Sequence, residues 1–117
     1  MFFRFQDHVV YERVAIFTKE VYSLTGRLPS YEQPGLIQKL RDLASQMLQD
    51  LAEGYSHTPD TNESTAIDRC IISMGKIASL VDLCFQLDYL DVTTHKKWLM
   101  SCEELTKRLY ETRKSLK

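Results

Sequence analysis

The sequence has few of the residues that turn-rich, disulfide-linked or membrane-spanning proteins require. It contains only 4 glycines and 3 prolines among 117 residues, too few for a β protein with many turns. No stretch reaches the roughly 18 consecutive apolar residues of a membrane-spanning helix. The opening residues 1–5 are too short and too soon charged to resemble a signal peptide. We therefore expect a cytoplasmic protein without membrane contact.

Cysteine is also scarce, with Cys70, Cys84 and Cys102 as the only three. The number is odd and no Cys-x-x-Cys pair occurs, so neither a disulfide framework nor a zinc site is predicted. Cys70 and Cys84 are two heptads apart and share one helix face. Because free buried cysteine behaves as a small apolar residue, we expect these side chains in the core.

The chain also lacks an excess of either charge, because 15 basic and 16 acidic residues leave a net charge of −1. That balance excludes a generally basic nucleic-acid coat. Hydrophobic residues make up 44% of the chain, which is ordinary for a globular domain and too many for a disordered one. The length corresponds to a single domain over residues 1–117.

Apolar residues recur at helical spacing in four blocks, within residues 10–24, 36–55, 67–85 and 98–116. In the first block, Val10, Val14, Phe17, Val21 and Leu24 follow steps of four and three. Short connections between long amphipathic helices favour antiparallel neighbours. The pattern predicts an all-α fold, an antiparallel up-down-up-down four-helix bundle.

Residues at the block ends predict where helices start and stop. Gly26 follows the first block and is expected to end that helix in the left-handed conformation. Ser30, with Gln33 three residues later, fits a capping box for the second helix. Asp91 is a favourable N-cap for the last helix.

Further apolar side chains lie off the four main stripes. A bundle buries one face of each helix, so a second stripe indicates contacts between subunits. We expect such contacts from Tyr11, Tyr22, Ile37, Ile72, Leu80, Leu83, Leu99 and Met100. The alternative is a scatter of ordinary surface apolar residues.

Short phrases in a fixed order resemble a known family. They are VYSLT at 21–25, LP at 28–29, PGL at 34–36, AEGY at 52–55, MGKIA at 74–78 and LDYL at 87–90. Together they are similar to the bacterial four-helix-bundle proteins encoded by intervening sequences within 23S ribosomal RNA genes. The resemblance implies a homo-oligomer, a pentameric ring, with no established enzymatic activity and with RNA as a possible partner.

The alternative implied by the resemblance is the accessory variability determinant of diversity-generating retroelements, which is related in fold. That protein is a pentameric barrel that binds a reverse transcriptase and nucleic acid. It is typically strongly basic and ends in a Gly-Gly-Trp phrase, and this sequence has neither property.

Four residues in or near the matched phrases are candidates for assembly or partner contact, namely Tyr22, Arg41, Glu53 and Tyr55. Glu53 is expected in the last turn of its helix, where a negative charge faces the unfavourable end of the helix dipole. A partner for this carboxylate is therefore predicted, either Arg41 or a residue of a neighbouring subunit.

The last block carries most of the positive charge. Residues 96–117 hold seven basic and three acidic side chains, a net charge of +4, while residues 1–95 have a net charge of −5. Complementing the helix dipole explains part of this bias. Repeated around a ring, the patch would become a positive rim that binds phosphates. The candidate nucleic-acid-binding residues are Lys107, Arg108, Arg113 and Lys114, whereas Trp98 lies on the apolar stripe and is expected in the core.

Nothing in the sequence predicts catalysis, a cofactor, a metal or a small-molecule substrate. The histidines His8, His57 and His95 form no His-x-x-x-His pair, and His57 with Asp60 would give a metal only two ligands. No glycine-rich phosphate loop or Gly-x-Ser-x-Gly turn occurs. An enzyme built on a bundle would need an inward-facing cluster of glutamate and histidine, which the stripes lack. We expect a protein without enzymatic activity.

Overall fold

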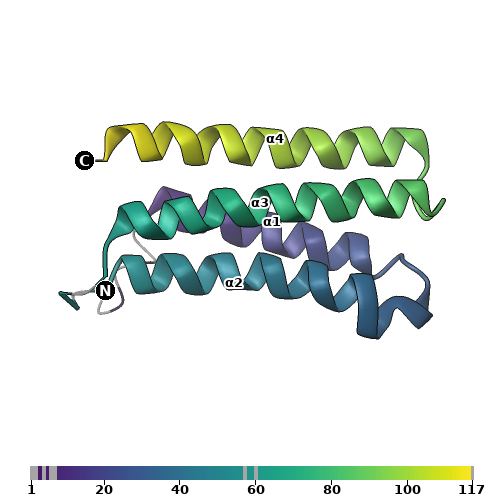
Figure 1. Ribbon diagram of the computed structural model, residues 1–117, viewed down its shortest axis with the longest axis horizontal. Helices are drawn as coiled ribbons and strands as arrows, with labels where there is room; N and C mark the ends of the chain where they lie inside the picture. Colours follow the sequence, from purple (N-terminus) through teal and green to yellow (C-terminus); the bar gives the residue numbers. More distant parts are fainter. Residues whose placement is uncertain (1–2, 4, 6–7, 57, 60, 117) are drawn as a thin grey trace.

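Four long helices make up the computed structural model, which describes residues 3, 5, 8–56, 58–59 and 61–116. They are α1 (Val9–Thr25), α2 (Gln38–Gly54), α3 (Glu63–Gln86) and α4 (Val92–Ser115). Two short turns precede α2, a 3₁₀ turn η2 (Ser30–Glu32) and a π-helical turn η3 (Gln33–Ile37). Successive helices run in opposite directions along a body of 45 × 26 × 21 Å (Figure 1). The predicted antiparallel four-helix bundle is confirmed, and the described residues form no strand.

The core follows the predicted stripes. Fully buried side chains come from all four helices and include Val14, Val21, Leu40, Met47, Leu51, Ile67, Met74, Ile77 and Leu109. The three cysteines are free and buried, as predicted. No helix within the described ranges is long and apolar enough to cross a membrane.

The predicted end of the first helix at Gly26 is confirmed, but the conformation of Gly26 and the predicted start of the second helix need correction. Gly26 follows the end of α1 but adopts a right-handed conformation with φ −64°. The positive φ, 63°, belongs to Asp88 instead. Ser30 opens η2 and does not cap α2. The Glu32 carboxylate instead caps η3, the turn that leads into α2, by accepting a hydrogen bond from the Leu36 amide at 3.3 Å.

Gly35 explains why Glu32 can act as the cap. A Cβ at Gly35 would lie 2.6 Å from Glu32 Oε1, so a larger residue there would displace the carboxylate from its capping position. The prediction for Asp91 is confirmed, because its Oδ1 accepts from the Thr94 amide at 2.7 Å. Hydrogen bonds from the backbone amide and the side chain of Thr94 lower the pKa of the Asp91 carboxyl.

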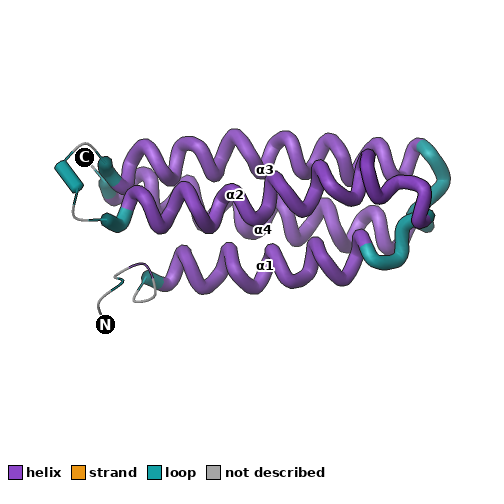
Figure 2. The backbone as a smooth tube through the Cα atoms, turned by 90° about the horizontal axis from the view of Figure 1, so that it is seen from below, coloured by secondary structure: helices purple, strands orange, loops and turns teal. Residues whose placement is uncertain are grey.

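The α1–α2 and α3–α4 connections lie at the same end of the bundle (Figure 2). Tyr89 joins them, donating its hydroxyl proton to Glu32 Oε2 at 2.8 Å. The Tyr31 hydroxyl lies 3.1 Å from that of Tyr89. This polar cluster fixes the first connection against the second.

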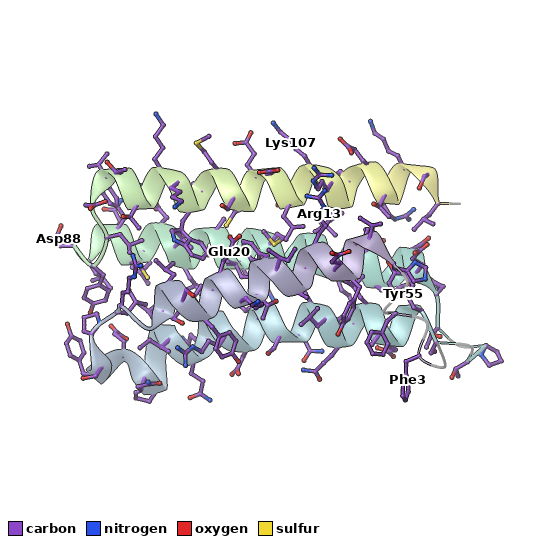
Figure 3. The ribbon with its side chains drawn as sticks, turned by 180° about the vertical axis from the view of Figure 1, so that it is seen from behind. Phe3, Arg13, Glu20, Tyr55, Asp88 and Lys107 are labelled. Atoms are coloured by element: carbon purple, nitrogen blue, oxygen red, sulfur yellow. The ribbon has the colours of Figure 1, made fainter. Side chains whose placement is uncertain are left out.

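The position of α1 distinguishes this bundle from a regular four-helix square. α1 packs more extensively on α2 than on α4. In the view of Figure 3, α1 is inclined to α4 and lies nearer to it at the N-terminal end of α1 than toward Thr25. No hydrogen bond or ion pair joins α1 to α4 among the described residues. The bundle is therefore open along one side.

The predicted second stripes are present only in part. Ile37 is buried, because η3 turns it into the core. Tyr11, Leu80 and Leu99 are half-buried against the core. The side chains that remain exposed are Tyr22, Ile72, Leu83 and Met100.

Candidate functional site

The four predicted nucleic-acid-binding residues lie on different sides of α4. A helix turns 100° per residue, so Lys107 and Lys114 share the outward side while Arg108 and Arg113 point to opposite flanks. Lys107 extends outward from α4 in Figure 3. Arg108 lines the groove between α1 and α4. The structure thus divides the predicted patch into an outward row and two flanks.

Two of these cations have acidic partners. Arg113 Nε donates to Asp68 Oδ1 of α3 at 2.8 Å. Lys107 Nζ lies 3.2 Å from Glu103 Oε1, and both side chains are well exposed to solvent, so this pair is weak. Arg108 and Lys114 have no ion-pair partner within the described part of the chain. Arg108 on the flank toward α1 and Lys114 on the outward side therefore remain unpaired, although Glu103 and Glu111 share the outward side with Lys107 and Lys114.

The groove between α1 and α4 runs along the open side of the bundle. Near the N-terminal half of α1 its cavities are small, about 120 and 140 Å³, and Arg13 and Arg108 line both. Where α1 diverges, the groove widens into a cavity of about 480 Å³. We call this cavity the wedge; it is lined by Ile16, Lys19, Glu20, Ser23, Leu24, Arg27, Lys97, Trp98 and Ser101.

Sequence reasoning did not identify the wedge residues. Trp98 was expected in the core, but it is only half-buried and lines the wedge. Its ring lies 6.2 Å from that of Phe17, at an interplanar angle of 64°. One sequence pattern could have indicated this side of the first helix: Arg13, Glu20 and Arg27 are spaced by seven residues and therefore share one face. Figure 3 shows Arg13 and Glu20 extending from α1 toward α4.

Of the four predicted assembly residues, Tyr22 and Arg41 lie together. The Arg41 guanidinium carbon is 4.6 Å from the centre of the Tyr22 ring. Arg41 Nε donates to Thr25 Oγ1 at 2.8 Å, and Arg41 also donates to the Tyr22 carbonyl at 3.4 Å. Arg41 thereby joins α2 to the last turn of α1.

The predicted pair between Glu53 and Arg41 is wrong. The two residues are twelve positions apart on one helix, about 18 Å at 1.5 Å per residue. Glu53 Oε2 instead accepts from Arg69 of α3 at 3.3 Å. Both side chains are more than half exposed, so this pair contributes little to stability.

Tyr55 closes one end of the bundle and is 8% exposed. The His8 ring stacks on it at 3.6 Å, and His8 Nδ1 lies 3.8 Å from Glu63 Oε1. Burial raises the pKa of the Tyr55 hydroxyl, and the nearby Glu63 carboxylate raises it further. That hydroxyl is buried and has no hydrogen-bond partner among the described residues. His8 therefore covers one face of the Tyr55 ring.

The buried thiols are unsuited to act as nucleophiles. Burial raises the pKa of Cys70 to about 12 and those of Cys84 and Cys102 to about 11, with smaller contributions from nearby carboxylates. All three are therefore protonated near neutral pH. The described residues hold no group of three potential metal ligands, and His57 and Asp60 lie outside those residues.

The arrangement thus offers binding chemistry: exposed cations along α4, exposed apolar side chains on α3, and a wedge that combines cations with an aromatic ring. The family model of the 23S rRNA-intervening sequence protein matches residues 6–111. Searches of curated proteins and of solved structures gave no match.

Proposed function

The chain belongs to the 23S rRNA-intervening sequence protein family, and from this membership we propose that it is a non-catalytic protein that assembles with copies of itself and binds RNA. The observation that carries the proposal is the uncancelled positive charge of α4. Lys96, Lys97, Arg108 and Lys114 are exposed and have no ion-pair partner among the described residues.

Such a surface suits a phosphate backbone. Lysine and arginine that neutralise phosphates release condensed counterions, which makes the affinity strongly dependent on salt. A single copy carries only a modest patch, because the whole chain has a net charge of −1. Several copies in a ring would place their α4 helices around one rim and add their charges. Assembly and RNA binding therefore support each other in this proposal.

Assembly is proposed through the outward face of α3. Ile72 and Leu83 are 61% and 41% exposed. They are eleven positions apart, three helical turns, and so lie on one face. The small residues Gly75 and Ser79 lie beside them and would permit a neighbouring helix to approach closely, while Lys76, four positions after Ile72, is the charged residue of that face. A pentamer is the number that the family resemblance implies.

The absence of catalysis is likewise proposed. It is supported by the raised pKa values of the three thiols, which keep them protonated. The alternative, an accessory protein of a diversity-generating retroelement that binds a reverse transcriptase, stays a prediction. A reverse-transcriptase gene beside the coding sequence would favour it.

Fluorescence anisotropy of a labelled fragment of 23S ribosomal RNA, measured across a salt series, tests the proposed RNA binding. Reversing the charge of Lys107 and Lys114 to glutamate should weaken binding. The dependence on salt should also become shallower, by about one unit of slope for each phosphate that is no longer neutralised. Lys39→Glu is the matched control, because Lys39 is exposed on α2, away from α4. Equal affinity of the α4 variant and the native chain at every salt concentration would contradict the proposal.

A further inference from the structure

The wedge between α1 and α4 has the features of a binding pocket. Its volume, about 480 Å³, lies within the range of about 300–1,000 Å³ typical of small-molecule sites. Its floor is apolar, formed by the buried Leu24 and the half-buried Trp98, with Ile16 at its side. The wedge exists because α1 diverges from α4, and no described side chain bridges its mouth by a hydrogen bond or ion pair.

Three cations converge on the wedge. Lys19 comes from α1, Arg27 from the segment that follows it, and Lys97 from the second turn of α4. None of them forms an ion pair with a described residue. Glu20 is the acidic residue of the lining, which leaves the wedge with a net charge of +2. An anionic ligand would relieve the repulsion among the three cations.

The polar and aromatic groups narrow the ligand class. The hydroxyls of Ser23 and Ser101 line the wedge and have no hydrogen-bond partner among the described residues, so they can bond to a ligand. The Trp98 indole offers an aromatic surface beside them. A nucleotide has a group for each of these: a phosphate that the cations can bind, sugar hydroxyls that can bond to the two serines, and a flat base that can pack on the Trp98 ring.

We propose that the wedge binds one unpaired nucleotide of an RNA strand, with its base against Trp98 and its phosphate among Lys19, Arg27 and Lys97. This inference rests on the proposed RNA binding and assigns it a specific pocket. A base held in a duplex cannot reach the floor of the wedge, so the pocket selects single strands. The outward row of α4, with Lys107 and Lys114, would then follow the backbone of the same strand.

Trp98 is the single tryptophan of the chain, so its fluorescence reports on the wedge alone. The experiment titrates the full chain with an eight-nucleotide oligouridylate labelled at its 5′ end. Anisotropy of the label reports all binding, and quenching of Trp98 reports occupation of the wedge. We expect both signals to saturate at the same RNA concentration, and an RNA duplex of equal length to cause little quenching.

Substitutions in the wedge should change the affinity for RNA in opposite directions. Lys97→Gln should lower the affinity for the oligouridylate several-fold. Glu20→Gln, which removes the opposing carboxylate, should raise it. Lys39→Gln on α2 should leave it unchanged. Trp98→Phe keeps a packed ring on the floor and should retain anisotropy binding, whereas Trp98→Leu should lower the affinity about tenfold.

The two signals distinguish binding in the wedge from RNA binding elsewhere on the chain. Anisotropy that rises without quenching of Trp98 would overturn the wedge and leave RNA binding through the outer side of α4 intact. Equal quenching by duplex and single strand, or a Glu20→Gln variant that binds no better, would also overturn it. No anisotropy change with any RNA would contradict the proposed RNA binding itself.

Discussion

Arg41 Nε donates a hydrogen bond of 2.8 Å to the hydroxyl of Thr25, which is completely buried at the end of α1. The same hydroxyl donates to the Val21 carbonyl at 2.8 Å. The guanidinium also lies over the Tyr22 ring. One side chain of α2 therefore holds the last turn of α1 at the end where α1 diverges from α4.

Replacing Arg41 with alanine should lower the free energy of unfolding by about 1–2 kcal/mol, because the substitution removes a charged hydrogen bond and a cation–π interaction together. Urea denaturation followed by circular dichroism measures the change. Lys39→Ala, two residues earlier and exposed, should have almost no effect. If both variants unfold at the native urea midpoint, Arg41 does not join the two helices as described.

Two glycine-to-alanine substitutions should change stability in opposite directions. A Cβ at Gly54 would lie 2.5 Å from the Cβ of Ala66 and 3.1 Å from the Asn62 carbonyl oxygen. Gly54→Ala should therefore destabilise the bundle by about 1–3 kcal/mol. Gly75 lies within α3 with nothing within 4 Å of such an atom, so Gly75→Ala should stabilise by about 0.5–1 kcal/mol. A melting temperature of Gly54→Ala at or above that of the native chain would contradict the close packing at the end of α2, and a lowered one for Gly75→Ala would contradict the open surroundings of Gly75.

Stability should fall at alkaline pH. An ordinary thiol has a pKa of 9.0, while burial raises that of Cys70 to about 12. Above pH 9 the unfolded chain loses this proton and the folded chain keeps it, so rising pH favours unfolding. The free energy of unfolding should be independent of this thiol below about pH 8 and fall as pH rises from about 9 to 12.

Urea denaturation at several pH values measures that fall. In Cys70→Ala the fall should be shallower by up to about 1 kcal/mol per pH unit, whatever the stability of the variant at neutral pH. Identical slopes in the variant and the native chain would mean that this thiol ionises as easily in the folded state as in the unfolded one.

Assembly should depend on the outward face of α3. Ile72→Lys combined with Leu83→Lys should reduce the mass measured by light scattering while the helix content stays the same, because both side chains lie outside the core. Met100→Lys is the matched control, since Met100 is 59% exposed on α4 and lies outside that face. Loss of assembly in the control alone would place the subunit interface on α4.

The helices could be predicted because their stripes depend on local spacing. Steps of three and four residues place Val14, Phe17 and Val21 on one side of a helix wherever that helix packs. The N-cap at Asp91 is local as well. The capping box predicted at Ser30 was wrong because the actual cap depends on a contact that no motif shows. Without a Cβ at Gly35, the Glu32 carboxylate can reach the Leu36 amide and cap η3 ahead of the second helix.

The features of the site depend on contacts between helices, which spacing within one helix does not show. Glu53 pairs with Arg69 because α2 and α3 pack in one particular register. The wedge arises from the inclination of α1, and it exposes Trp98 although this residue lies on the apolar stripe. Charge counting correctly placed an excess of cations on the last helix, but it could not separate Arg113, paired with Asp68, from Lys114.

Light scattering on a sizing column, with absorbance recorded at 260 and 280 nm on protein purified without nuclease, tests assembly and RNA binding in one experiment. We expect a mass near five times the 13.7 kDa of one chain, together with excess absorbance at 260 nm that nuclease removes. An oligomer without that excess would contradict RNA binding and leave assembly. A monomer with the absorbance ratio of protein alone would contradict the proposed assembly and RNA binding together.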